Sequence, residues 1–158
     1  MVGSKNRFAQ EIVEAKFFDN LNSIDDLIKK ISKGYNFNNR GIQLTKGDIF
    51  EIFCEAYLST NPEYQVKEVY PQGYVPVKIR KKLKLSFQDK GYDGVYRTID
   101  GNLHTYQAKF RTKSDKLNWA QDYKGGLSSF IGVSEQAHIR HLLATTNKVD
   151  SEFLSKPR

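Results

Sequence analysis

The chain has 158 residues, of which 39% are hydrophobic and 13% aromatic, and its formal net charge is +7. This length suits one domain, and the apolar content is too high for an intrinsically disordered chain. The single cysteine excludes a disulfide framework and a zinc site built from cysteine pairs. No apolar run reaches the roughly 18 residues of a membrane span, and the first residues lack the apolar segment of a secretory signal. We therefore expect a soluble, intracellular domain that is located in the cytoplasm.

The N-terminal part of the chain predicts two helices. Apolar residues recur at helical spacing from Phe8 to Phe18, and again after Ser23. Ser23 is a favourable N-cap, with Asp26 three residues later, and Gly34 ends the second helix. We expect residues 1–43 to be a helical extension without an assigned role, and residues 44–158 to be the main domain.

The strongest helix signal runs from the N-cap Thr45 to Thr60, before the Asn61-Pro62 pair. Its apolar residues have helical spacing and predict a buried face formed by Phe50, Phe53, Cys54, Tyr57 and Leu58. Acidic residues at three- and four-residue steps share a second stripe, and these are Asp48, Glu51 and Glu55.

The middle of the chain predicts strands. Tyr64 to Tyr70 reads as a strand, whereas Val77 to Leu85 fits a short helix as well as a strand. The clearest β signal is a hairpin with strands at 93–99 and 103–110, joined by Asp100-Gly101.

Helical spacing returns from Trp119 to Ile131, although Gly125-Gly126 weakens the pattern. A short apolar strand follows at His141 to Thr146. The order of helices, strands, helix and strand predicts a mixed α/β domain, in which a small mixed sheet is flanked by helices.

The basic residues are concentrated in one segment. Residues 78–124 hold twelve lysines and arginines against five aspartates, which accounts for the whole net charge of +7. A localised basic segment indicates a polyanionic partner, and nucleic acid is the most common one. The candidates for phosphate contacts are Lys78, Arg80, Lys81, Lys82, Lys84, Arg111 and Lys113.

The hairpin also predicts a site. Alternate residues of a strand share a face, so Gln107 and Lys109 point the same way. Asp93 begins the opposite strand, fourteen residues before Gln107, and the hairpin returns it to the same end. Glu51 adds a second carboxylate if its helix packs beside the hairpin, and Glu55 is an alternative.

This grouping suits hydrolysis of a phosphodiester. Mg²⁺ takes oxygen ligands and keeps several waters, and it both activates a water and neutralises phosphate charge. Asp93, the Gln107 amide oxygen and the Ala108 backbone carbonyl are the candidate ligands. Lys109 is placed to activate the attacking water or to stabilise developing charge. The sequence indicates no comparable role for the three histidines or for Cys54.

These residues carry a family resemblance. Gly91-Tyr92-Asp93-Gly94-Val95, followed by Tyr106-Gln107-Ala108-Lys109, resembles the D…(E/Q)xK signature of the PD-(D/E)XK nuclease superfamily, in its Mrr-like restriction endonuclease branch. Residues 47–51 resemble the segment that carries that branch's helix-borne glutamate, and residues 142–146 resemble the strand after its catalytic hairpin. Trp119, together with residues 127–132, resembles the variant fused to helicase or translocase modules in restriction systems.

The resemblance implies a restriction-endonuclease-like αβββαβ core and Mg²⁺-dependent cleavage of DNA, with Mn²⁺ as a substitute metal. Asp93, Gln107 and Lys109 correspond to the core of the site, with Glu51 in support. We expect helicase, translocase or methyltransferase segments downstream in a longer chain, and two copies for a double-strand break. The chain departs from the commoner pattern by having Gln107 in place of an acid.

Two other functions are compatible with the sequence. One is a nucleic-acid-binding module of the same fold that does not cleave, which the missing second acid favours. The other is a protein-interaction domain, for which we expect negligible DNA affinity despite the basic charge. The choice between DNA and RNA is also open from the sequence.

Overall fold

The computed structural model describes residues 12, 16–33, 44–85, 91–112, 115–146, 148, 149, 151 and 152. Most of the helix expected at Phe8 to Phe18 lies outside these residues. The helix expected after Ser23 is confirmed as α2 (Ile24–Ser32), and the Ser23 hydroxyl accepts a hydrogen bond from the backbone N–H of Asp26.

The described residues form a mixed α/β fold around a four-stranded sheet with strand order β1-β2-β3-β4. The strands are β1 (Val66–Pro71), β2 (Gly94–Thr98), β3 (Leu103–Lys109) and β4 (Arg140–Ala144). β2 is antiparallel to β1 and β3, whereas β4 runs parallel to β3. The predicted fold class is therefore confirmed at the level of a small mixed sheet with helices.

The predicted hairpin is confirmed as β2 and β3. Gly94 pairs with Tyr106, and Thr98 donates its backbone N–H to the carbonyl of Asn102 at 3.0 Å. Gly101 has a φ of +86°, a left-handed conformation that glycine adopts without a steric penalty. This turn fixes the register that brings the start of β2 beside the end of β3.

Helix α3 (Lys46–Thr60) begins with a capping box between Thr45 and Asp48, as predicted. The predicted buried face was partly wrong, because Ile49 and Ile52 are also buried, whereas Tyr57 is 39% exposed. The reason is that one side of α3 packs on the sheet while another contacts buried residues of the N-terminal region, among them Leu27 and Ile31. A helix covered on two sides needs more than one apolar stripe.

The ambiguous segment after β1 forms a short helix, α4 (Val77–Lys82). Ile79, Leu83 and Leu85 are buried, while the lysines between them are exposed. α4 thus attaches to the domain through its apolar residues and presents its charges to solvent.

The expected helix at 119–131 is divided into three pieces: α5 (Trp119–Asp122), a π-helical turn η2 (Tyr123–Leu127) and α6 (Ser128–Val133). Gly126 has a φ of +122°. Gly125-Gly126, which weakens the helix pattern in the sequence, lies within this π-helical turn.

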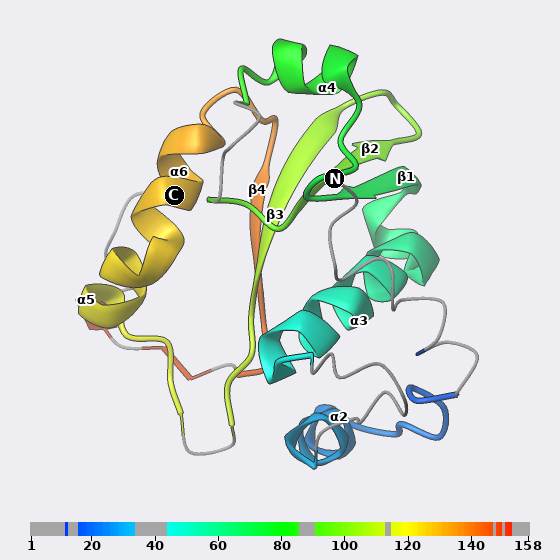
Figure 1. Cartoon of the computed structure of the whole chain (residues 1–158), viewed down its shortest axis with the longest axis vertical. Helices are drawn as coiled ribbons and strands as arrows, with labels where there is room; N and C mark the ends of the chain where they lie inside the picture. The colour runs from blue at the N-terminus through cyan, green and yellow to red at the C-terminus, as the bar shows by residue number, and fades with distance from the viewer. Residues whose placement is uncertain are drawn as a thin grey trace.

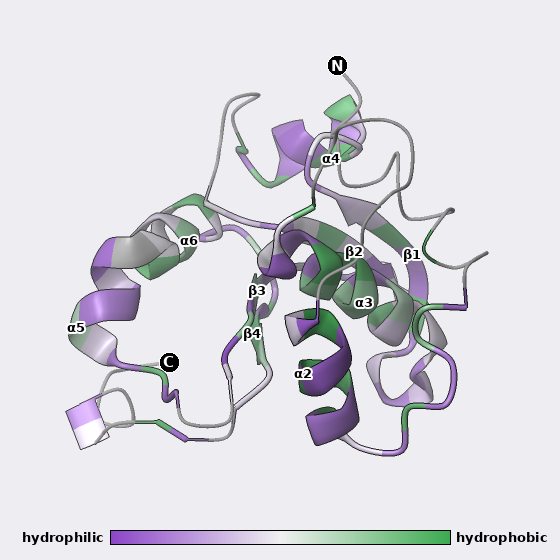
Figure 2. Cartoon of the chain, turned by 60° about the horizontal axis from the view of Figure 1, so that its bottom comes forward, coloured by the Kyte–Doolittle hydropathy of each residue, from purple (hydrophilic) through white to green (hydrophobic). Residues whose placement is uncertain are grey.

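Figure 1 shows the sheet between α3 on one side and α5, η2 and α6 on the other. Ile12, Phe17, Leu27 and Ile31 belong to the same apolar cluster as α3, so the described part of the N-terminal extension shares the core of the domain. In Figure 2, α2 lies beside α3 and carries both hydrophobic and hydrophilic residues. No described helix combines the length and the apolar character needed to cross a bilayer.

Candidate functional site

Asp93 lies at the seam between β2 and β3. Its backbone N–H donates to the carbonyl of Tyr106 at 2.9 Å, and its Oδ2 accepts from the backbone N–H of Ala108 at 2.7 Å. β2 and β3 are direct neighbours, so no strand separates Asp93 from the end of β3. The hairpin therefore holds the Asp93 carboxylate against the backbone of Ala108, the residue between Gln107 and Lys109.

The hydrogen bond from Ala108 also orients its carbonyl. The N–H and C=O of one strand residue point to the same side of the strand. Because the Ala108 N–H points to Asp93, the Ala108 carbonyl oxygen points to that edge of β3 as well. The Asp93 carboxylate and the Ala108 carbonyl oxygen, two possible ligands for a cation, thus lie on the side of β3 that faces β2.

Gln107 is only 6% exposed. Its Nε2 donates to the carbonyl of Gly91 at 3.4 Å. Its Oε1 is buried without a hydrogen-bond partner among the described residues. A buried amide oxygen in this state is costly unless a water, an ion or a donor reaches it, so its chemistry fits a hard cation.

Lys109 shares a face with Gln107 beneath the η2 turn. A Cβ built on Gly126 would lie 3.6 Å from Gln107 Nε2 and 3.8 Å from Lys109 Nζ. Both side chains therefore approach the same point of η2, and Lys109 is half-buried there. The sequence placed Gln107 and Lys109 together, but it did not predict that a turn covers them.

Glu51 and Glu55 lie on α3, on the opposite side of the sheet. Burial raises the pKa of the Cys54 thiol, and the charges of Asp93 and then Glu51 raise it further. Burial also raises the pKa of Glu55. The Cys54 thiol on α3 is therefore within reach of the charges of both Asp93 and Glu51, whereas Gln107 and Lys109 approach the η2 turn on the α5–α6 side.

Tyr106 is a site neighbour that the sequence analysis missed. It is 1% exposed, and a Cβ on Gly94 would lie 2.3 Å from its hydroxyl oxygen. Burial raises the pKa of this phenol, and the charges of Glu55, Cys54, Asp93 and Glu51 add to the effect. The phenol thus lies within reach of the acids of α3 and of Asp93, in space that only a glycine at position 94 leaves open.

The basic candidates differ in their surroundings. Lys78, Lys81, Lys82 and Lys84 are exposed on and after α4, and Arg80 is half-buried. The Arg111 guanidinium is paired with Asp122, so much of its charge is neutralised within the chain. Lys113 lies outside the described residues.

No group of three or more His, Cys, Asp and Glu side chains in the described part of the chain is arranged to hold a metal ion. The predicted ligand set is of another kind, since it combines one carboxylate with an amide oxygen and a backbone carbonyl. The free Oε1 of Gln107 and the shared edge of Asp93 and Ala108 fit such a set.

All three histidines of the chain gather on the sheet, away from Gln107. His141 Nε2 lies 2.7 Å from the Tyr96 hydroxyl and 3.4 Å from His104 Nδ1. The His104 and His138 ring centroids are 5.4 Å apart. His104 is more than 30 residues from the other two in sequence, and the pairing of β3 with β4 brings it to them.

This cluster predicts a loss of stability in acid. Burial, and then the charges of His141 and His138, lower the pKa of His104 from 6.5 to about 4. The unfolded chain takes up a proton near pH 6.5 that the folded chain resists, so the contribution of His104 to the free energy of unfolding falls between pH 6.5 and 4 and is constant below pH 4. We expect a loss on the order of 2–3 kcal/mol, measured by urea unfolding at several pH values.

His104→Phe keeps a ring against Tyr96 and removes the titrating group. The slope of unfolding free energy against pH is therefore expected to be flatter in this variant than in the parent. An equal slope in both proteins would show that the cluster does not control the acid response.

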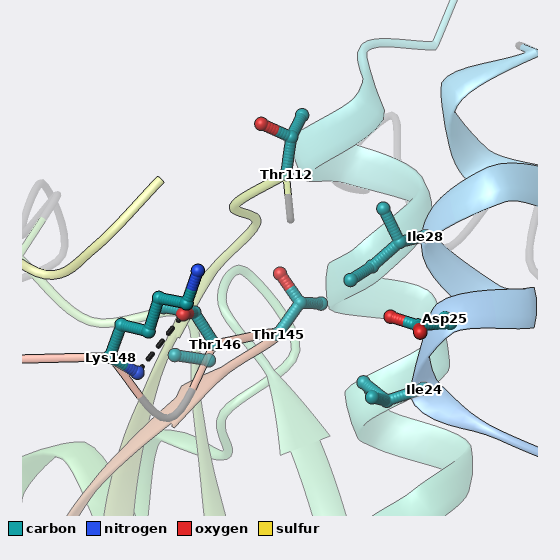
Figure 3. A pocket seen from close by; sticks show the side chains of 8 residues that line it. Ile24, Asp25, Ile28, Thr112, Thr145, Thr146 and Lys148 are labelled. Atoms are coloured by element: carbon teal, nitrogen blue, oxygen red, sulfur yellow. Dashed lines mark hydrogen bonds between the residues drawn. The ribbon is translucent and has the colours of Figure 1, made fainter. Parts of the chain in front are cut away.

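Two hollows lie away from these residues. Figure 3 shows one of about 390 Å³, between α2 and the ends of β3 and β4. Its threonine hydroxyls are already bonded within the chain: Thr112 to Asp115, Thr145 to the Arg111 carbonyl, and Thr146 to the Asp115 carbonyl. The other, of about 330 Å³, is lined mainly by apolar residues of α3 and β4. We assign no ligand to either hollow.

Comparisons with known proteins give no relative. No protein-family model, curated protein or solved structure matches the chain.

Proposed function

We propose that this domain is a Mg²⁺-dependent endonuclease of the PD-(D/E)XK type that hydrolyses phosphodiester bonds of DNA. The observation that carries the proposal is the hydrogen bond from the Ala108 N–H to the Asp93 carboxylate. This contact supports the proposal because it holds the acid at Ala108, between Gln107 and Lys109 in β3, and these two side chains both approach η2.

The order of the elements supports the proposal. α3 is followed by β1, β2 and β3, then by α5–α6 and β4, with α4 inserted between β1 and β2. Apart from α4, this is the αβββαβ order that the Mrr-like resemblance implies. The same fold can carry different functions, so the proposed activity depends on the residues of the site.

Each residue has a proposed role. Asp93, the Gln107 Oε1 and the Ala108 carbonyl would hold the metal, which supplies Lewis-acid stabilisation of the phosphate and a more acidic water. Lys109 orients this water and stabilises negative charge as it develops. Glu51 supports Asp93 from the α3 side. A single domain would cut one strand at a time, so a double-strand break requires a second copy or a translocating partner.

Lysines of α4 are proposed to hold the DNA backbone. Replacing Lys78, Lys81 and Lys82 by glutamine is expected to weaken DNA binding uniformly across sequences. It should also lower the slope of log affinity against log salt by about 2–3, because each lost phosphate contact contributes about 0.9. The change is measured by fluorescence anisotropy with a duplex at several salt concentrations.

The matched control removes the same charge elsewhere. Lys16, Lys29 and Lys33 are exposed in the N-terminal region. Their triple glutamine variant is expected to keep most of the parent's salt slope. If the two variants reduce the slope equally, the binding is a response to net charge and α4 is not a contact surface.

Nicking of supercoiled plasmid, with a parallel gel shift, tests the function. The nuclease proposal predicts relaxed plasmid with Mg²⁺ or Mn²⁺, and intact plasmid with EDTA. Binding without cleavage in either metal would favour the inactive DNA-binding module, for which the uncharged, buried Gln107 is the specific argument. The absence of both binding and cleavage at low salt would contradict both proposals.

A further inference from the structure

The η2 turn, which approaches the candidate site at Gly126, also carries an aromatic side chain. Gly126 of this turn lies close to Gln107 and Lys109, and Tyr123 precedes it by three residues in the same five-residue turn. π-helical turns are rare and are frequent at functional sites. The turn is therefore positioned to contact a substrate bound at Lys109.

Tyr123 is supported by the single tryptophan of the chain. The Tyr123 and Trp119 ring centroids are 4.9 Å apart, with an angle of 30° between the rings. Trp119 is half-buried and packs against the core cluster beside α5 and α6, whereas Tyr123 is 42% exposed. The tyrosine ring is thus held against the protein on one side while much of its surface stays open.

The charges around this pair favour an anionic partner. Lys116 and Lys124 are exposed on either side of the pair in sequence. The neighbouring acids are engaged within the chain, since Asp122 is paired with Arg111 and Asp115 accepts from Thr112. An exposed aromatic ring with exposed lysines nearby in the chain suits single-stranded nucleic acid, which proteins bind through base stacking and phosphate contacts.

We propose that Tyr123 stacks on the base of an unpaired nucleotide of the strand bound at the candidate site. This inference rests on the proposed function and adds to it a preference for single-stranded or locally opened DNA. The stack needs no base-specific hydrogen bond, so the contact accepts any base. Trp119 holds the Tyr123 ring in place and acts as a positioning residue.

Trp119 provides a direct readout, because it is the one tryptophan in the sequence. The probes are a mixed-sequence single-stranded oligonucleotide, its duplex, and heparin as a polyanion without bases, all with EDTA to prevent cleavage. We expect the single strand to change tryptophan fluorescence more than the duplex does, and heparin to leave it nearly unchanged. Tyr123→Ala is expected to weaken single-strand binding by roughly 5- to 100-fold.

Tyr123→Phe keeps the ring and is expected to bind like the parent, and heparin affinity should be the same in all three proteins. Circular dichroism melting checks that Tyr123→Ala is folded, and Tyr123→Leu serves as a second variant that keeps bulk. Equal single-strand affinity in the parent, Tyr123→Ala and Tyr123→Leu would overturn the stacking proposal. So would equal fluorescence changes with heparin and the single strand.

The two proposals fail in different ways. If the parent binds single strands through Tyr123 but never nicks plasmid, the stacking surface stands and the nuclease proposal falls. If the parent nicks plasmid and Tyr123→Ala has no effect on binding, the nuclease proposal stands and the stacking proposal falls.

Discussion

The Asp93→Asn variant is expected to lose at least about 100-fold of the Mg²⁺-dependent nicking rate while it keeps its fold. Asparagine has the same size, and its amide oxygen can still accept from the Ala108 N–H, so the seam between β2 and β3 is preserved. What disappears is the charge that would bind the metal. Loss of a residue that hydrogen-bonds to a metal ligand typically lowers metal affinity or activity 10–100-fold. Loss of a direct ligand is expected to lower it at least as much.

Asp100→Asn is the matched control for this variant. Asp100 is exposed in the hairpin turn, and its replacement removes the same charge from the same hairpin. We expect nicking close to the parent rate. Comparable loss in both variants would assign the effect to net charge, and retained nicking in Asp93→Asn would remove Asp93 from the site.

The Gly94→Ala variant is expected to lose about 3 kcal/mol of unfolding free energy. The added Cβ would lie 2.3 Å from the Tyr106 hydroxyl oxygen and 2.4 Å from two carbons of its ring. The ring is 1% exposed, so the core around it resists movement. Overpacking of a closed core costs typically 1–3 kcal/mol. Urea unfolding followed by circular dichroism measures the change.

A double-mutant cycle identifies the cause. In a Tyr106→Leu background the ring is absent, and Gly94→Ala is expected to cost little. Gly132→Ala is the control for a glycine without a close neighbour, because a Cβ there would meet no other residue within 4 Å. Alanine also stabilises an exposed helical position relative to glycine. If Gly94→Ala costs the same with and without the Tyr106 ring, the close approach of the phenol is not the reason for the glycine.

Local chemistry made much of the fold predictable. The capping signals at Ser23 and Thr45 act within four residues, so they can be read directly from the sequence. The same holds for the Asp100-Gly101 turn, which sets the register of β2 and β3. These are interactions whose partners are close in sequence.

The failures concern partners that are distant in sequence. The burial of Ile49 and Ile52 depends on contacts on a second side of α3, which its own periodicity does not reveal. His104 meets the other two histidines only through strand pairing. The pairing of Arg111 with Asp122 joins the end of β3 to α5, so an arginine selected for phosphate binding also has a structural role.

The candidate site shows the same division. Strand alternation was enough to place Gln107 and Lys109 on one face, and the hairpin was enough to return Asp93 to the backbone of Ala108 between them. The sequence pattern could not show that η2 covers these side chains or that the Tyr106 ring lies over Gly94 of β2. Gly94 and Gly126 are the sequence signals for these contacts, but a glycine alone does not indicate which side chain needs the space.

The position of a bound metal shows directly whether Asp93, Gln107 and Ala108 form a cation site. Crystals of the protein soaked in Mn²⁺ can be examined by anomalous scattering, which locates the ion without reference to activity. The account predicts a peak in direct contact with the Asp93 carboxylate, the Gln107 Oε1 and the Ala108 carbonyl oxygen. A peak bound elsewhere, or no peak at these oxygens when Mn²⁺ is saturating, would contradict it.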